Sequence, residues 1–173
     1  KVEIVYLRPL DLSIDETLTA LREAVERTGA KRAVIDSLSG LELALAPTFR
    51  EDFRESLYRM VGALTSMGVT VVSTVELPDA YTNLQFSPHG IAFLSDAIIM
   101  QRYLEIEGEL RRAISVVKVR NSQHSKEIRE YSIDSSGTLI IGSRLGAYRG
   151  LLTGTPREGE SRDESDRNST STR

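Results

Sequence analysis

Strand-like and helix-like stretches alternate through the first half of the chain, and this alternation restricts the fold more than any other feature. Short apolar runs cover residues 2–7, 32–36 and 69–75. Between them, apolar residues recur at helical spacing over about 13–28 and 47–67. Regular alternation of this kind is typical of a parallel sheet flanked by helices. We therefore expect an α/β fold in which the run at 32–36 is a buried strand.

Capping signals mark the starts of both expected helices. Ser13 and Glu16 form an S-x-x-E capping box, and Thr48 and Glu51 form a second one. The first helix is expected to follow a strand at 2–7 directly. We expect a loop over 37–46, between the strand at 32–36 and the second helix.

The second half of the sequence changes to consecutive strands. Turn signals lie at Glu107–Gly108 and Ser136–Gly137, and residues 77–90 read as a long loop with a short helix before Asp96. An antiparallel extension of the parallel sheet is the simplest arrangement. The expected strands are 97–106, 110–120, 127–133 and 138–141.

The end of the chain has a different composition. No aliphatic or aromatic residue follows Leu152, so residues 156–173 cannot bury enough apolar surface to offset the entropy of ordering them. We expect one domain over 1–155 and a disordered, charged tail over 156–173. The chain opens at Lys1 without methionine and is strand-like at once, so we expect that an upstream portion precedes it.

Composition excludes several kinds of site. The chain has no cysteine, which excludes disulfides and thiolate metal sites and fits the cytoplasm, and its two histidines give zinc little support. No apolar run approaches the roughly 20 residues that span a bilayer. A net charge of -3 argues against a surface built to bind nucleic acid. We expect a cytoplasmic protein with neither a membrane nor a nucleic acid as its partner.

Asp36 ends the apolar run Ala33-Val34-Ile35. A carboxylate at the carboxyl end of a buried strand is the Walker B pattern, in which it holds Mg²⁺ directly or through water beside a nucleotide. Ordinary α/β strands also end in aspartate, because it caps the following turn or helix. Taken alone, the pattern leaves both interpretations open.

Several basic residues lie in the expected strand over 110–120. Because residues two apart share a face of a strand, Arg112, Lys118 and Arg120 are expected on one side, with Lys118 and Arg120 adjacent. Such a face suits phosphate binding. A solvated strand edge that is protected from aggregation by its charges is the alternative.

Two longer stretches of sequence help to choose between the interpretations of Asp36 and of the basic strand. The stretch Arg32–Leu41 (R-A-V-I-D-S-L-S-G-L) and the stretch Arg112–Tyr131 (R-A-I-S-V-V-K-V-R-N-S-Q-H-S-K-E-I-R-E-Y) together resemble the KaiC family of circadian-clock ATPases and their bacterial and archaeal relatives. The segment Tyr148–Pro156 resembles the end of a domain in that family. This resemblance implies a partial RecA-like P-loop NTPase core, with ATP and Mg²⁺ as cofactors.

In that family a K-x-R-G-x-x-H segment reaches from one protomer into the nucleotide site of its neighbour, within a ring usually of six subunits. The resemblance implies that Lys118 and Arg120 approach the neighbour's phosphates. Arg120, alone or with Arg112, would act as an arginine finger. His124 and the backbone near Val119 and Ser122 would contact the base and sugar, and Asp134 would lie near a further weak nucleotide contact.

Two positions carry open questions. Asn121 stands where the family usually has glycine, and asparagine is among the residues that best tolerate positive φ, so the turn can persist. Glu76 follows the strand-like run 69–75. It would either polarise water or sense phosphate, or simply be a polar strand end.

The phosphate-binding loop is missing from this sequence. That loop needs G-x-x-x-x-G-K-[ST], and none of the lysines at 1, 31, 118 and 126 follows a glycine. The leading hypothesis is therefore the C-terminal part of an ATPase that hydrolyses ATP, with or without self-phosphorylation, and that is inactive as this fragment. The alternatives are an oligomerisation or partner-docking module in signalling and, third, a DNA recombinase of the RecA type.

Overall fold

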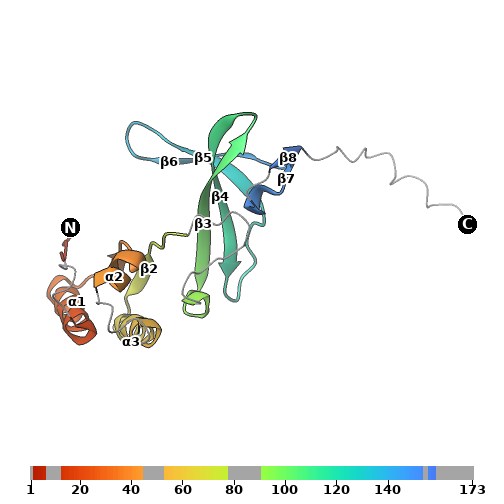
Figure 1. Cartoon of the computed structure of the whole chain (residues 1–173). Helices are drawn as coiled ribbons and strands as arrows, with labels where there is room; N and C mark the ends of the chain where they lie inside the picture. Colours follow the sequence, from red (N-terminus) through yellow and green to blue (C-terminus); the bar gives the residue numbers. More distant parts are fainter. Residues whose placement is uncertain (1, 7–12, 45–52, 78–90, 154–155, 159–173) are drawn as a thin grey trace, which may run out of the picture. The chain divides into compact units, whose positions relative to one another are not determined.

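The structure is a computed structural model of the 173-residue chain (Figure 1). It describes residues 2–6, 13–44, 53–77, 91–153 and 156–158. The described residues before Ser95 form one compact unit, and those from Ser95 onward form a second. Within these ranges, no helix has both the length and the apolar character that crossing a membrane requires.

The first helix, α1 (Ile14–Thr28), begins at the predicted capping box. The Ser13 hydroxyl accepts a hydrogen bond from the Glu16 N–H at 3.3 Å, and the Glu16 carboxylate accepts one from the Ser13 N–H at 2.7 Å. These bonds satisfy amides that a helix start leaves without partners. Gly29 ends the helix in the left-handed conformation, with φ 64°. The predicted helix is confirmed.

Two parallel strands, β1 (Arg32–Ile35) and β2 (Thr70–Ser73), form the sheet of the first unit. Between them in sequence lies α3 (Phe53–Ser66), and the short 3-10 helix η2 (Ile91–Phe93) comes after β2. The predicted alternation of helix and strand is confirmed for these elements. The second predicted capping box, at Thr48 and Glu51, lies outside the described residues.

The loop expected over 37–46 contains a helix, α2 (Leu38–Ala44). The Ser37 hydroxyl accepts a hydrogen bond from the Gly40 N–H at 3.0 Å, and Leu38 is buried in the core. The sequence did not predict this helix, because α2 is only 7 residues long and too short to display a helical period.

The β1–β2 pair packs on the helices through one face. Ala33, Ile35 and Val71 point toward the buried core, whereas Val34 and its register partner Val72 on the other face are 69% and 49% exposed. Within the described residues, only one face of this pair is therefore covered. The buried core residues are Leu38, Phe53, Leu57, Met60, Leu64 and Val69.

Val2–Tyr6 form no strand, although the sequence predicted one at 2–7; Leu7 lies outside the described residues. Val2 and Ile4 are almost fully exposed. A strand is stable only where a neighbouring strand satisfies its backbone groups, and none of the described strands pairs with this segment. The apolar run alone was therefore insufficient to make it a strand.

The second unit is built on a four-stranded antiparallel sheet in the order β3-β4-β5-β6. The turn between the first two strands has positive φ at both central residues, Glu107 (54°) and Gly108 (77°), as two-residue hairpin loops favour. The predicted strands and this turn are confirmed. The strand bounds are β3 (Ala97–Ile106), β4 (Glu109–Val119), β5 (Ile128–Ile133) and β6 (Leu139–Arg144).

The antiparallel arrangement predicted for these four strands is confirmed. They belong to the second unit, and their predicted pairing with the parallel sheet of the first unit stays a prediction. Two further short strands, β7 (Tyr148–Arg149) and β8 (Arg157–Glu158), pair with each other, and the 3-10 helix η3 (Leu151–Thr153) lies between them. Arg157 and Glu158 belong to the tail expected to be disordered, and residues 159–173 lie outside the described ranges.

A β-bulge interrupts the pairing of β3 with β4. Ile98 pairs with Lys118 but Ile99 pairs with Val116, so Val117 is an extra residue on β4. Because Ile98 and Ile99 point to opposite faces of the sheet, Val116 and Lys118 do so as well. Sequence periodicity, which assumes an uninterrupted strand, cannot detect this change.

The C-terminal segment covers one face of the antiparallel sheet. Leu145 and Leu151 are buried against β3 and β4, and an Arg102 guanidinium nitrogen donates a hydrogen bond to the carbonyl of Leu152. The Tyr148 hydroxyl donates to Glu107 at 2.8 Å, and this bond raises the pKa of Tyr148. The buried residues of this core are Leu104, Ile106, Ala113, Leu145 and Leu151.

The turn after β4 gives a stability prediction. Asn121 has φ 57°, in the left-handed region that β-branched residues strongly disfavour. Asn121→Val should therefore lower the free energy of unfolding by about 1–2 kcal/mol, measured by urea denaturation, while Asn121→Gly should not. Gln123→Val, two residues further on, is the matched control. Equal stability of Asn121→Val and the parent would contradict the assigned turn.

Candidate functional site

Asp36 and Thr74 lie side by side at the carboxyl ends of β1 and β2. Their preceding residues, Ile35 and Ser73, are register partners. The Thr74 hydroxyl donates a hydrogen bond to Asp36 Oδ1 at 2.6 Å, and the Thr74 N–H donates to the carbonyl of Ile35 at 3.1 Å. The carboxylate is exposed and held in one direction by the neighbouring strand.

The segments that follow the two strands are also bonded to each other. The Leu38 N–H donates to the Thr74 carbonyl at 2.9 Å, and the Glu76 N–H donates to the Ser39 hydroxyl at 3.4 Å. These bonds place Glu76 at the same edge of the sheet as Asp36, with an exposed side chain. The Asp36–Ser37 peptide bond is cis. The structure brings together these two predicted site residues.

Asp36 supplies an oxygen ligand of the kind that Mg²⁺ prefers. Among the described residues, no three His, Cys, Asp or Glu side chains gather as a metal cluster. Magnesium usually binds one or two carboxylates together with substrate phosphates and water, rather than a complete set of protein ligands. Asp36, exposed at a strand end, matches that requirement.

Lys118 and Arg120 both contact the two residues that precede β3. Lys118 Nζ donates to the carbonyl of Ser95 at 2.9 Å, and Arg120 Nη1 lies 3.1 Å from Asp96 Oδ1. The Arg120 N–H also donates to the Asp96 carbonyl at 2.6 Å. The structure therefore keeps these two cations together, as the sequence predicted.

Arg112 does not join them. It pairs with Tyr103, on the face of the sheet opposite to Lys118. Arg112 Nε donates to the Tyr103 hydroxyl at 3.3 Å, and its guanidinium carbon lies 5.7 Å from the centre of the tyrosine ring. The prediction that one face carries Arg112, Lys118 and Arg120 was wrong, because the bulge at Val117 reverses the alternation.

The loop after β4 carries the remaining predicted contacts from this stretch. Val119 is the last residue of the strand, and Asn121 keeps the turn through its positive φ. The Ser122 hydroxyl donates to the Gln123 carbonyl at 3.1 Å. His124 Nδ1 lies 2.9 Å from the Ser125 carbonyl oxygen.

Asp134 shapes the turn between β5 and β6. Its Oδ1 accepts hydrogen bonds from the Ser136 hydroxyl at 2.6 Å, the Ser136 N–H at 2.8 Å and the Thr138 N–H at 2.9 Å. The hydroxyl bond from Ser136, followed by the Thr138 amide, lowers the pKa of Asp134. This carboxylate oxygen is therefore engaged within its own turn.

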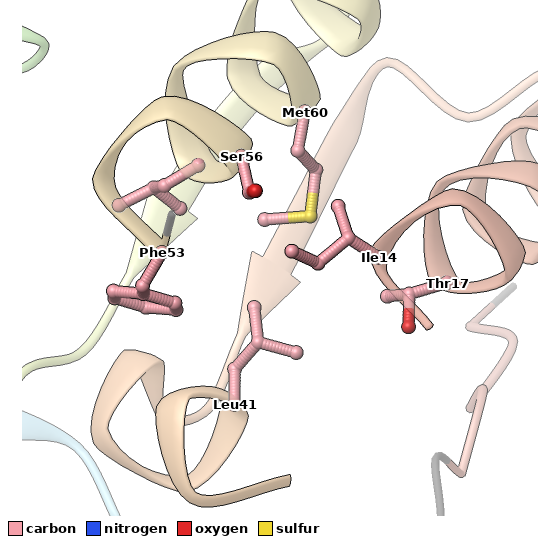
Figure 2. Close-up of a pocket in the computed structure, with 7 residues that line it drawn as sticks. Ile14, Thr17, Leu41, Phe53, Ser56 and Met60 are labelled. Carbon is pink, nitrogen blue, oxygen red and sulfur yellow. The ribbon is translucent and has the colours of Figure 1, made fainter. Parts of the chain in front are cut away.

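Figure 2 shows an apolar pocket in the first unit. Side chains from α1, α2 and α3 line it, and none of them carries a charge. Ligand sites usually add a few convergent polar groups to an apolar lining. We interpret this pocket as a gap in helix packing. Its lining residues are Ile14, Thr17, Leu41, Phe53, Ser56, Leu57 and Met60.

Sequence reasoning missed two residues that contact the predicted ones. Thr74 bonds to Asp36, and Asp96 bonds to Arg120. The signal for Thr74 was its position just beyond a strand that could pair in parallel with the Asp36 strand. The signal for Asp96 was weaker. Asp96 lies beside Arg120 because Ala97 pairs with Val119, and this strand register has to be known before the contact can be predicted.

Comparisons with known proteins all indicate the same family. A family model described as "ATPase: KaiC" matches residues 9–144. The chain is 31% identical to the circadian clock protein KaiC3 of Synechocystis sp. (strain ATCC 27184 / PCC 6803 / Kazusa) and 31% identical to the circadian clock oscillator protein KaiC of Rippkaea orientalis (strain PCC 8801 / RF-1). These alignments cover 90% and 86% of this chain, but only 30% and 28% of the relatives.

A solved structure is similar as well. It is that of a KaiC-like protein from the hyperthermophilic archaeon Pyrococcus horikoshii OT3, with a TM-score of 0.66 and 28% sequence identity. The match covers 75% of this chain and 57% of that one. The chain thus spans less than a third of the two relatives and little more than half of this structural neighbour.

The Asp134 turn predicts a pH effect on stability. Because the folded state lowers the pKa of Asp134, the charged carboxylate stabilises the fold above about pH 4, and this contribution is lost as pH falls through the lowered value. Asp134→Asn should therefore make the free energy of unfolding fall less steeply with acidification, in urea titrations from pH 5 to about pH 2.5. Ser136→Ala, which removes the main cause of the shift, should change the slope in the same direction. An unchanged slope in both variants would contradict the assignment.

Proposed function

Because the chain belongs to the KaiC family of ATPases, we propose that it contributes two parts of ATP sites that lie between protomers of a ring oligomer, usually of six subunits. One part is the Mg²⁺-side carboxylate Asp36, and the other is the pair of cations Lys118 and Arg120. The observation that carries the proposal is the Asp36–Thr74 pair at the carboxyl ends of two parallel strands, where ligands of open α/β sheets bind.

Asp36 is the carboxylate that would hold Mg²⁺ in this site. The 2.6 Å bond from Thr74 limits the directions that the carboxylate can take, so a ligand does not have to order it on binding. Mg²⁺ held by Asp36 would neutralise charge that develops during phosphoryl transfer. Glu76, exposed at the same edge, is proposed to orient the attacking water.

Lys118 and Arg120 are proposed to act on the nucleotide of a neighbouring protomer. Lysine supplies a point charge, and the planar guanidinium can bind two phosphate oxygens at once. Arg112 lies on the opposite face of the sheet, so we assign the finger role to Arg120 alone. Contacts to the base and sugar are proposed for His124 and the backbone near Val119 and Ser122, and a further weak nucleotide contact is proposed near Asp134.

The chain is proposed to be inactive as a fragment. Its sequence contains no G-x-x-x-x-G-K-[ST] loop, whose backbone amides and lysine hold the β- and γ-phosphates. We propose that another portion of the full-length protein provides this loop. ATP hydrolysis, with or without self-phosphorylation, would then require the assembled protein.

A second candidate function is a non-catalytic oligomerisation or partner-docking module. Edge strand β6 favours it, because all of its residues are exposed, including Leu139, Ile140 and Ile141. Exposed apolar edge strands pair readily with other chains. Association of the full-length protein that does not respond to nucleotide would support this alternative.

Replacement of Arg120 tests the ATPase proposal. In the full-length protein, Arg120→Ala should lower the turnover rate by about 10³ to 10⁵, because the charge that stabilises the transition state is lost. Arg120→Lys should restore little, since lysine lacks the planar fork. Arg149→Ala, which removes another exposed arginine of the same unit, should leave turnover unchanged. The 173-residue chain alone should give no turnover in the same assay.

Mixed assemblies test whether Arg120 acts across an interface. Subunits with Arg120→Ala, exchanged with subunits with Asp36→Asn, should regain part of the activity, because some interfaces then combine an intact metal side with an intact finger. If verified mixtures remain as inactive as either parent, Arg120 does not act on a neighbour's nucleotide.

A further inference from the structure

The segment Ser95–Asp96 holds both proposed phosphate-binding cations. It immediately precedes β3, and it accepts bonds from Lys118 Nζ at the Ser95 carbonyl and from the Arg120 N–H at the Asp96 carbonyl. The Asp96 carboxylate adds an ion pair with the Arg120 guanidinium at 3.1 Å. Asp96 therefore contacts Arg120 at both ends, through its main chain and through its side chain.

The bulge at Val117 makes this arrangement possible. Without the extra residue, Lys118 would share the face of Arg112 and Val116. With it, Lys118 points to the other face and reaches the Ser95 carbonyl at 2.9 Å. β-Bulges frequently redirect a side chain next to a functional site.

We propose that Asp96 is a positioning residue that presents the Arg120 guanidinium toward a phosphate group of a bound nucleoside triphosphate. This inference rests on the role of Arg120 proposed above. A long, flexible arginine side chain populates many conformers, and each conformer that points away from the phosphate reduces the fraction ready for catalysis. The backbone bond fixes the main chain from which the Arg120 side chain extends, and the ion pair favours conformers in which the guanidinium lies beside Asp96.

The exposure of the Arg120 and Asp96 side chains favours a positioning role for Asp96 over a role in folding stability. The Arg120 and Asp96 side chains are 47% and 82% exposed, and ion pairs at such positions contribute little to folding stability. The carboxylate also offsets part of the positive charge that attracts phosphate. Asp96→Asn should therefore lower kcat, expressed per folded protomer, while KM stays equal or falls. Loss of folded protein alone would leave this normalised kcat unchanged.

The first experiment measures the order of the Arg120 side chain without any nucleotide. In the 173-residue chain, the ¹⁵N–¹H heteronuclear NOE of Arg120 Nε should drop clearly in Asp96→Asn and recover at least partly in Asp96→Glu. Glu109→Gln, which removes a carboxylate near Arg111 instead, should leave the Arg120 signal unchanged. An unchanged Arg120 NOE in Asp96→Asn would overturn the proposal.

The second experiment measures turnover of the full-length protein. Asp96→Asn should lower kcat by about two- to fivefold, the range that one exposed ion pair allows, without raising KM. Equal kcat in Asp96→Asn and parent, where Arg120→Ala is inactive, would overturn the positioning role. If Arg120→Ala retains full activity while Asp96→Asn still disorders Arg120, the contact is supported and the proposed function of Arg120 fails instead.

Discussion

The parallel pairing of β1 with β2 determines where the first part of the candidate site lies. Ile35 and Ser73 are register partners, so the residues that follow them, Asp36 and Thr74, leave the sheet together and form a 2.6 Å hydrogen bond. The core beneath the strands maintains this register, because a shift by one residue would expose the apolar face that packs on the helices. The orientation of one carboxylate thus depends on the packing of the whole first unit.

In the second unit, a single extra residue has a comparable effect. Val117 reverses the alternation of β4, so that Lys118 faces the segment before β3 while Arg112 contacts Tyr103 on the other side. Asn121, in the left-handed region, then turns the chain just beyond Arg120. The two units carry chemically complementary groups: a carboxylate suited to a metal in the first, and cations suited to phosphate in the second.

Local signals were sufficient to predict much of this arrangement. The capping box of α1, the apolar run ending at Asp36 and the positive φ of Asn121 depend on nearby residues, and the structure confirms them. Features that depend on pairing between distant segments were missed or wrong. The Thr74–Asp36 and Asp96–Arg120 contacts require the strand register, the bulge reverses a face that periodicity had predicted, and the run at 2–6 forms no strand without a partner.

We propose that Asp36 and Arg120 of different protomers act on one nucleotide. The most direct measurement is a cryo-EM structure of the full-length assembly with Mg²⁺ and a slowly hydrolysed ATP analogue. The Arg120 guanidinium of one protomer should lie within hydrogen-bond distance of a γ-phosphate whose Mg²⁺ is beside Asp36 of the next protomer. A nucleotide contacted by Asp36 and Arg120 of the same protomer, or by neither residue, would contradict it.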